Sequence, residues 1–410
     1  MSETDVIIIG GGAAGLLCAI QSAWLGKEIA VIEHMRKPGR KLLITGKGRC
    51  NVTNNCDAET VMKNIPRNAS FMYSSLSRFS PEDTMAFFES LGVELKTERG
   101  NRVFPKSDKA ETILDALVGA AKQAGVKFIA DDARKLIAEN GAVRGVSCEK
   151  AEYYAHKVVV ATGGRSYPLT GSTGDGYKLA MQAGHRVTEI SPSLCPIVTE
   201  ERYCAEMMGL SLRNCTFTLY DNKSGKILFT ELGEMLFTHF GLSGPLALSA
   251  SAHMDKITKG RYTVSIDLKP ALSHEKLDER ILRDFNEFPN RDFSNALKKL
   301  LPAKMIDTVV RLSGIEPYKK VNQITRTERG RLAGILKDMR FSVKALRPIE
   351  EAIITRGGVD VREISPKTME SKLVKGLYFI GEVLDVDGYT GGFNLQIAFS
   401  TAYACAADVS

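Results

Sequence analysis

The start of the chain combines a strand, a glycine-rich turn, a helix and a second strand that ends in an acidic residue. Residues 5–9 (DVIII) are rich in β-branched residues, and residues 10–15 (GGGAAG) satisfy the pattern GxGxxG. A segment of helix length follows over 16–25, and a second strand over 28–33 ends in Glu33. This order predicts a βαβ unit of a Rossmann-like α/β domain that binds a dinucleotide.

Each part of this unit has a physical role in holding a dinucleotide. The first glycine allows the tight turn, the second lets a pyrophosphate approach the backbone, and the third lets the helix pack on the strand. The helix N-terminus presents free N–H groups to the phosphates, and the acid accepts hydrogen bonds from ribose hydroxyls. The cofactor-binding residues expected here are Gly10, Gly12, Ala13, Ala14, Gly15 and Glu33.

Composition and charge exclude several classes of protein. The 410 residues carry a net charge of +7, which is too small for a histone-like or strongly acidic protein. No apolar run reaches the ~18 residues of a membrane helix, and the acidic start at residues 1–5 is unlike a secretory signal. The eight cysteines form no CxxC pair, so we expect a cytoplasmic protein with no metal site and no disulfide framework.

Three later segments are typical of flavoproteins of the glutathione-reductase type, in which the first βαβ unit holds FAD. Residues 126–148 read as strands around an Asn140-Gly141 hairpin turn, and a buried strand over 158–161 ends in Thr162 and Gly163. A strand near the C-terminus ends in Gly381 and Glu382, and glycines open a helix over 395–407. The expected cofactor residues here are Thr162, Gly163, Gly381, Glu382, Gly391, Gly392, Phe393 and Asn394.

A second strand-GxGxxG-helix unit is missing from the sequence. Residues 171–176 come nearest, but they follow a loop and not a strand. A separate NAD(P)H domain is therefore not expected. If NAD(P)H reduces the flavin, it must dock in an open cleft and leave again.

Five longer segments resemble the BaiN/YhiN-like flavoproteins, also called aminoacetone-oxidase-like. They are residues 39–54, 100–105, 161–176, 236–245 and 381–396. The first contains TGKGRCN where the family has SGGGRCN, so Thr45 and Lys47 depart from the pattern, and residues 400–404 depart as well. The resemblance places Lys41, Gly48, Arg49 and Asn51 in a loop beside the flavin.

This resemblance implies bound FAD, an inserted β-barrel, an inserted helical domain and oxidoreductase activity. Relatives are associated with amine oxidation, reduction of a steroid intermediate, and formation of dihydrouridine in ribosomal RNA. The expected domains are an FAD-binding domain over 1–194 and 357–410, a β-barrel over 195–272 and 340–356, and a helical insertion over 273–339.

The residues of the insertions support this division. Two apolar runs over 216–220 and 226–230 flank a hairpin loop. In the helical insertion, Ser273 can cap a helix, and residues 325–328 form a capping box. The first of these helices is expected to place Leu277, Ile281, Phe285 and Phe288 on one buried face.

Positive charge concentrates in two places. Residues 36–49 include six basic side chains and no acid, which suits phosphate neutralisation. Residues 298–331 include nine basic and three acidic side chains, a net +6. Either run can simply form a solvent-exposed face of the protein. Alternatively, the second run can be a surface that binds the phosphates of ribosomal RNA. The named RNA candidates are Lys298, Lys299, Lys319, Lys320, Arg326, Arg329 and Arg331.

Two residues are candidates for proton transfer. Cys50, if exposed beside the flavin, could act as a general acid with its pKa lowered by Arg49. His239 is the best histidine candidate. Each has an alternative structural role, as a residue that packs the loop or as a satisfied structural histidine.

The sequence predicts an FAD-dependent oxidoreductase that passes a hydride from NAD(P)H through the flavin to an organic acceptor. Reduction of uridine to dihydrouridine in ribosomal RNA, an amine oxidase that releases hydrogen peroxide, and a non-catalytic flavin-holding RNA-binding protein remain alternatives. A disulfide reductase would need a Cys-x4-Cys pair, whereas Cys50 and Cys56 are separated by five residues.

Overall fold

The computed structural model describes residues 4–410, so the first three residues of the acidic start lie outside it. By its internal contacts the chain forms two compact units. The first comprises the chain up to Ser193 together with Pro348–Ser410, and the second comprises Leu194–Arg347. Among the described residues, no helix combines the length and the apolar character needed to cross a membrane.

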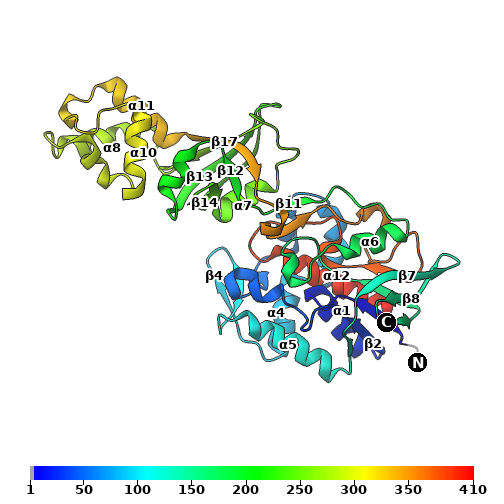
Figure 1. Ribbon diagram of the computed structural model, residues 1–410. Coiled ribbons are helices and arrows are strands. Elements are labelled where there is room, and N and C mark those ends of the chain that lie inside the picture. The colour runs from blue at the N-terminus through cyan, green and yellow to red at the C-terminus, as the bar shows by residue number, and fades with distance from the viewer. Residues whose placement is uncertain (1–3) are drawn as a thin grey trace. The chain divides into compact units, whose positions relative to one another are not determined.

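A five-stranded parallel sheet forms the centre of the first unit (Figure 1). The strands over Val6–Ile9 and Ile29–Ile32 are buried along their whole length, as their continuous apolar sequences require. Helix α1 (Ala13–Trp24) packs against α5 (Ala110–Gln123) and α12 (Phe393–Val409). This arrangement confirms the Rossmann-like α/β fold. In sheet order the strands are β19 (Leu377–Phe379), β10 (Lys157–Val160), β1 (Val6–Ile9), β2 (Ile29–Ile32) and β6 (Lys127–Ile129).

Smaller elements complete the first unit. The expected hairpin is present, and Asn140 (φ +49°) and Gly141 (φ +76°) both have the left-handed backbone of a type I′ turn. Two antiparallel sheets have three strands each. The first consists of β7 (Ala133–Glu139), β8 (Ala142–Cys148) and β9 (Glu152–Tyr154), and the second of β3 (Thr53–Asn54), β5 (Arg102–Pro105) and β4 (Leu95–Glu98). The remaining α-helices are α2 (Ala58–Lys63), α3 (Tyr73–Arg78), α4 (Pro81–Ser90) and α6 (Asp175–Gln182).

The second unit contains a closed six-stranded barrel, as expected. Alternating side chains fill its interior, among them the fully buried Phe217, Phe237 and Phe341. Helix α7 (Gly244–Ser251) follows the short strand β15. In barrel order the strands are β12 (Ile197–Thr199), β15 (Gly241–Ser243), β14 (Lys226–Thr238), β13 (Ser211–Asp221), β16 (Tyr262–Asp267) and β17 (Met339–Leu346).

The helical insertion has its own capped helices. Ser273 Oγ accepts the Lys276 N–H at 3.3 Å, and Thr325 with Glu328 forms the complete capping box. One expectation is wrong: Phe288 is 40% exposed, because α8 ends at Asn286 and does not carry this side chain into the core. The helices are α8 (His274–Asn286), α9 (Phe293–Ala296), α10 (Ala303–Ser313) and α11 (Arg326–Lys337).

The chain leaves the second unit nine residues earlier than expected, after Arg347 and not after residue 356. Strand β18 (Ile354–Arg356) explains this difference. It pairs antiparallel with β11 (Ser191–Ser193), which belongs to the first unit, so residues 348–356 return to that unit.

Candidate functional site

A cavity in the first unit lies where three parallel strands end, and Ile9, Ile32 and Ala161 form part of its wall. This is the edge at which α/β sheets bind ligands. Ten of the cofactor residues expected from sequence line it, namely Gly10, Gly12, Ala13, Ala14, Glu33, Lys41, Thr162, Gly163, Glu382 and Asn394. Eight others lie outside the lining, namely Gly15, Gly48, Arg49, Asn51, Gly381, Gly391, Gly392 and Phe393.

The glycines of the first turn differ in what surrounds them. A Cβ on Gly15 would lie 2.0 Å from the carbonyl oxygen of Gly10, so any side chain there would collide with the backbone. A Cβ on Gly12 would meet no protein atom within 4 Å, although Gly12 lines the cavity. Gly15 is therefore needed for packing, and Gly12 leaves room for a ligand.

The N-terminus of α1 opens toward the same cavity. Gly12 is its N-cap, and no side chain caps the first N–H groups. Glu33 holds the turn from the second strand, because its Oε2 accepts the Gly11 N–H at 2.8 Å and its Oε1 accepts the Met35 N–H at 2.7 Å. Free N–H groups and the positive end of the helix dipole make this a site for phosphate.

Glu382 is the centre of a polar cluster on the cavity wall. Its Oε2 accepts from Lys41 Nζ at 2.8 Å, and its Oε1 accepts from the Thr355 backbone N–H at 2.9 Å and the Ser166 hydroxyl at 3.2 Å. Lys41 Nζ also donates to Ser166 Oγ at 2.7 Å. A Cβ on Gly164 would lie 2.4 Å from Thr355 Oγ1, so this cluster needs a glycine there.

Sequence reasoning missed Ser166 and Thr355. Ser166 stands in the segment ATGGRSYP, where its fixed spacing from the strand could have drawn attention to it. Thr355 lies between two apolar residues and a basic one, and only the tertiary fold brings it to Glu382.

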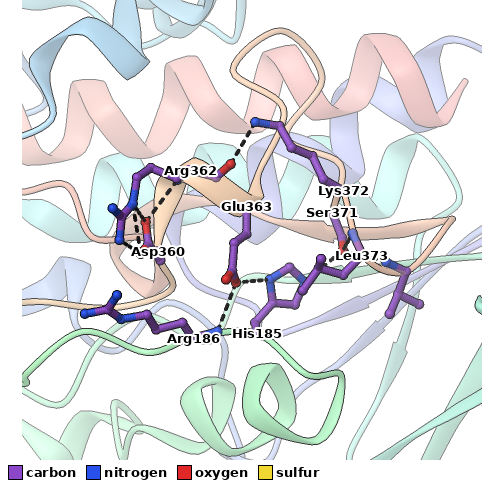
Figure 2. A network of polar contacts seen from close by, with 9 residues as sticks. His185, Arg186, Asp360, Arg362, Glu363, Ser371, Lys372 and Leu373 are labelled. Atoms are coloured by element: carbon purple, nitrogen blue, oxygen red, sulfur yellow. Dashed lines mark hydrogen bonds and ion pairs between the residues drawn. The ribbon is translucent and has the colours of Figure 1, made fainter.

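A second polar network supports the strand that leads to Glu382. Figure 2 shows the buried His185 ring, whose Nδ1 lies 3.0 Å from Glu363 Oε2 and whose Nε2 lies 2.8 Å from Ser371 Oγ. Ser371 Oγ already accepts the N–H groups of Leu373 and Val374, so its own hydrogen goes to Nε2.

This arrangement resembles a Ser-His-acid triad, but it acts as a support. Ser371 is buried and does not line the cavity, and the His185 ring packs edge-on against Phe379 of β19. Burial lowers the pKa of His185, although the neighbouring Glu363 carboxylate acts in the opposite direction.

The loop that carries Cys50 differs from the expectation. The Cys50 thiol is fully buried, and burial raises its pKa to about 12, opposed in part by a hydrogen bond to Thr45. Arg49 does not lower this pKa, because its guanidinium binds Glu98 at 2.8 Å and Asp108 at 3.1 Å and stacks over the Phe104 ring. Cys50 therefore packs the loop and does not meet the exposure that a general acid needs.

The departure at Lys47 stands where the backbone conformation favours glycine. This residue is exposed and has φ +60°, a left-handed conformation that glycine adopts without cost. Lys47 does not line the cavity, so its charge does not enter the wall.

Thiol reactivity gives a direct test of these burials. All eight cysteines are free; seven are buried, and Cys56 is partly exposed. We expect a thiol reagent to modify the native protein mainly at Cys56, with Cys50 reacting only after denaturation. Cys56→Ser should remove the reaction of the native protein, whereas Cys50→Ser should leave it unchanged; rapid labelling of Cys50 would contradict the structure.

His239 lies in the tight turn between β14 and β15 of the second unit. Its side chain is exposed and contacts the ring of Phe240. The cavity belongs to the first unit, so its described wall contains no contribution from His239.

The glycines before α12 are required by the close packing and the hydrogen bonds of this segment. A Cβ on Gly392 would lie 2.4 Å from the Thr53 backbone, and the Asn394 side chain accepts from Gly388 N and donates to Gly388 O. Asn394 reaches the cavity wall, together with Leu395 and Ile397 of the same helix.

At another part of the wall, His34, Asp132 and Asp175 place three possible metal ligands within 4.8 Å of one another. Asp175 is already paired with Lys178 at 2.7 Å, and Asp132 with Arg134 at 3.1 Å. The acidic charge is thus balanced by the protein, and we assign these residues to the polar wall of the cavity.

The cavity fits a flavin dinucleotide. The uncapped helix N-terminus, the open space at Gly12 and the nearby Lys37, Arg40 and Lys41 suit a pyrophosphate. Thr162 lines the same cavity, and its buried Oγ1 finds no hydrogen-bond partner among the described residues.

Comparisons with known proteins agree with this geometry. The family model described as HI0933-like protein Rossmann domain matches residues 4–408. The chain is 33% identical to the ribosomal RNA dihydrouridine synthase of Escherichia coli K12, covering 100% of this chain and 98% of the relative. It is 30% identical to the 3-dehydro-bile acid delta(4,6)-reductase of Clostridium scindens, covering 97% and 96% of the two chains.

A solved structure shows the same fold at low identity. The 3-ketosteroid delta1-dehydrogenase of Sterolibacterium denitrificans aligns with a TM-score of 0.52 and 13% identity, over 100% of this chain and 99% of that one. The family match over nearly the whole chain confirms the resemblance to BaiN/YhiN-like flavoproteins. The chain therefore belongs to the HI0933-like family of Rossmann-domain proteins and is an FAD-dependent oxidoreductase.

Proposed function

We propose that this flavoenzyme reduces uridine to dihydrouridine in ribosomal RNA, with NAD(P)H as a transient reductant. The observation that carries the proposal is the 33% and 34% identity, over nearly entire chains, to two relatives named ribosomal RNA dihydrouridine synthase. FAD, when bound, supplies the hydride chemistry. Reduction of the uracil C5–C6 bond also takes a proton, and the buried Cys50 is not suited to deliver it.

In this proposal the first unit binds FAD through the cavity described above. Gly12, Ala13 and Ala14 would hold the pyrophosphate at the N-terminus of α1, and Glu33 would bind the adenosine ribose. Glu382, fixed by Lys41, would orient the ribityl and pyrophosphate region. The roles of Gly48, Arg49, Asn51 and residues 391–394 toward the flavin stay predictions.

The structure changes which basic residues can bind RNA. The Lys319 ammonium holds the pKa of Glu328 down at about 2, so this pair is committed to each other. Lys298, Arg326 and Arg331 are exposed and form no ion pair within the described residues. The paired candidates are Lys299 with Glu287, Lys319 with Glu328, Lys320 with Asp292, and Arg329 with Asp278.

Charge reversal at the unpaired positions tests the RNA surface. Lys298→Glu, Arg326→Glu and Arg331→Glu together should weaken RNA binding by roughly 10- to 1000-fold at moderate salt and reduce its salt dependence, because three phosphate contacts are lost. Bound FAD should be unchanged.

A control triple variant changes the net charge by the same amount, but its three substitutions lie on the first unit. Lys122→Glu, Lys135→Glu and Lys367→Glu alter exposed residues with no ion pair among those described. If both triple variants bind RNA as the unchanged protein does, the helical insertion is not the RNA surface.

The activity itself is tested by complementation. Expressed in an Escherichia coli strain that lacks its own ribosomal RNA dihydrouridine synthase, the chain should restore dihydrouridine, measured by mass spectrometry of ribosomal RNA nucleosides. Absence of dihydrouridine from well-expressed, flavin-loaded protein would contradict the proposal. Rapid reoxidation by oxygen with peroxide release would instead support the amine oxidase.

A further inference from the structure

We propose that Lys47 and Arg102 bind phosphate groups of the RNA strand beside the cavity of the first unit. This inference rests on the proposed function, because it names the side chains that would hold the nucleotides next to the reduced uridine. It concerns two cations that do not line the cavity and do not belong to the basic helical insertion.

The first observation is the backbone at Lys47. Its φ is +60°, and the neighbouring Gly46 and Gly48 also have positive φ, of +56° and +81°. A lysine in this left-handed conformation is less favourable than a glycine. The Lys47 side chain is exposed and forms no ion pair with another described residue, so no such contact offsets the strain. Strain of this kind is typical of positions that serve a ligand.

The second observation is that Arg102 lies on the face that the Lys47 loop covers. Arg102 and Phe104 stand two residues apart on β5, so their side chains share one face of the β3–β5–β4 sheet. A Cβ on Gly46 would lie 3.1 Å from Phe104 Cε1, and the Arg102 guanidinium carbon lies 6.0 Å from the centre of the same ring. The loop and the arginine therefore meet around one aromatic side chain.

The third observation is that the acids of this region are already neutralised. Arg49 binds Glu98 at 2.8 Å and Asp108 at 3.1 Å. Lys96 Nζ lies 2.6 Å from Asp108 and 3.5 Å from Glu98. Two carboxylates are thus balanced by two cations, and neither carboxylate is left for a further basic side chain.

Arg102 remains outside this ion-pair network. It stands directly opposite Glu98 in the strand register, yet no ion pair joins the two side chains. Its Nε donates to the Arg99 carbonyl at 3.0 Å, and its two terminal nitrogens find no partner among the described residues. The planar fork of an arginine fits a phosphate group. Lys47 and Arg102 therefore leave this face with uncompensated positive charge.

This face adjoins the cavity through two segments. Thr45, two residues before Lys47, lines the cavity. Asn54, which pairs with Arg102 in the sheet, donates through Nδ2 to the Gly391 carbonyl at 3.0 Å, just before α12 reaches the cavity wall. A strand that places one base at the cavity would carry its neighbouring phosphates past these cations.

The phosphates of RNA and of NAD(P)H share the chemistry that these cations recognise. RNA is favoured because Lys47 is exposed and both side chains lie outside the cavity wall. An open face suits contacts along a phosphate backbone, whereas a small cofactor is usually enclosed in a cavity.

The experiment measures binding of the flavin-loaded enzyme to a fluorescent oligouridylate at several salt concentrations. Lys47→Gly and Arg102→Gln should each weaken binding by roughly fivefold at about 0.1 M salt, and each should reduce the salt slope by about 0.7. Lys47→Arg keeps the charge and should bind as the unchanged protein does. Lys47→Gly should melt at the same or a higher temperature, because glycine adopts this backbone without strain.

Lys256→Gly is the matched control. Lys256 is also exposed, has a positive φ of +42° and forms no ion pair with another described residue, but it lies in the second unit. Its replacement removes the same charge and relieves the same kind of backbone strain. Oligouridylate binding should therefore be unchanged, as should bound FAD in all these variants.

The NAD(P)H alternative is measured by anaerobic reduction of the flavin at increasing NADH or NADPH concentration. Lys47→Gly and Arg102→Gln should leave the apparent affinity for either nucleotide unchanged. The proposal is overturned if both variants bind oligouridylate normally, if Lys256→Gly loses as much affinity, or if the loss concerns NAD(P)H and not RNA.

The proposed function is tested separately by complementation. If dihydrouridine is still produced, each of the overturning outcomes removes the phosphate contacts and leaves the proposed function standing. Conversely, an enzyme that makes no dihydrouridine fails the proposed function even if Lys47→Gly weakens RNA binding.

Discussion

Gly15→Ala is expected to yield a protein that has lost FAD and much of its stability. The added Cβ, on the first turn of α1, would lie 2.0 Å from the carbonyl oxygen of Gly10 in the turn between β1 and α1. Relief requires α1 to move away from the sheet. Overpacking of this kind lowers the unfolding free energy by about 1–3 kcal/mol or more. The displaced helix N-terminus would no longer meet the pyrophosphate.

Gly12→Ala separates the ligand effect from the packing effect. Its Cβ meets no protein atom within 4 Å, and its backbone (φ −79°) is acceptable to alanine. We therefore expect a folded protein whose FAD affinity falls by on the order of tenfold to a hundredfold, because the methyl group occupies ligand space. The ratio of visible flavin absorbance to protein absorbance, with FAD titration of the stripped protein, measures this loss.

Gly119→Ala is the matched control, because it lies inside α5 with no atom within 4 Å of its added Cβ. Replacement of a helical glycine by alanine should raise the unfolding free energy by up to about 1 kcal/mol and leave FAD bound. A Gly15→Ala protein that keeps full flavin content and stability would show that the turn does not hold the cofactor as described.

The sequence was sufficient to predict the features that depend on interactions between neighbouring residues. The glycine turn, the Asn140-Gly141 hairpin and the capping box at Thr325 each depend on residues within a few positions of one another, and the structure contains them all. The barrel followed from the family resemblance, and its strands alternate as a closed sheet requires.

Contacts between distant segments could not be predicted in this way. Arg49 is adjacent to Cys50 in sequence, but its guanidinium is held by Glu98 and Asp108, so adjacency gave the wrong electrostatic partner. Charge counting likewise treated Lys319 as free, although Glu328 lies 2.7 Å away. Such pairings depend on side-chain positions that become defined only when the chain has folded.

The cluster around Glu382 is the clearest example of a site assembled from distant segments, and its removal should have the second large effect. Glu382→Ala would leave the Lys41 ammonium, the Ser166 hydroxyl and the Thr355 N–H without their shared acceptor. The side chains of Lys41 and Glu382 are 23% and 17% exposed. We expect a loss of about 2 kcal/mol in unfolding free energy, between the values of surface and buried pairs.

A double-mutant cycle isolates the ion pair from the rest of the cluster. Lys41→Met and Glu382→Gln each remove one charge, and Glu382→Gln keeps an oxygen that can accept the Thr355 N–H. If the pair is coupled as its 2.8 Å contact indicates, the double variant should be more stable than the sum of the single losses predicts, by about 1 kcal/mol. Urea denaturation of the flavin-stripped proteins measures this coupling without a contribution from FAD binding.

The same variants show whether the cluster serves the cofactor or only the fold. Because Glu382 and Lys41 both line the cavity, the single variants should also bind FAD more weakly, whereas Glu89→Ala, an exposed acid on α4, should change neither stability nor FAD binding. Additive stability losses with unchanged FAD affinity would mean that Lys41 and Glu382 are neighbours without a shared role. A loss of FAD affinity in the single variants, together with coupling of their stability losses, would mean that the ion pair orients the Glu382 carboxylate toward the cofactor. In that case neither charge alone accounts for the loss of FAD affinity.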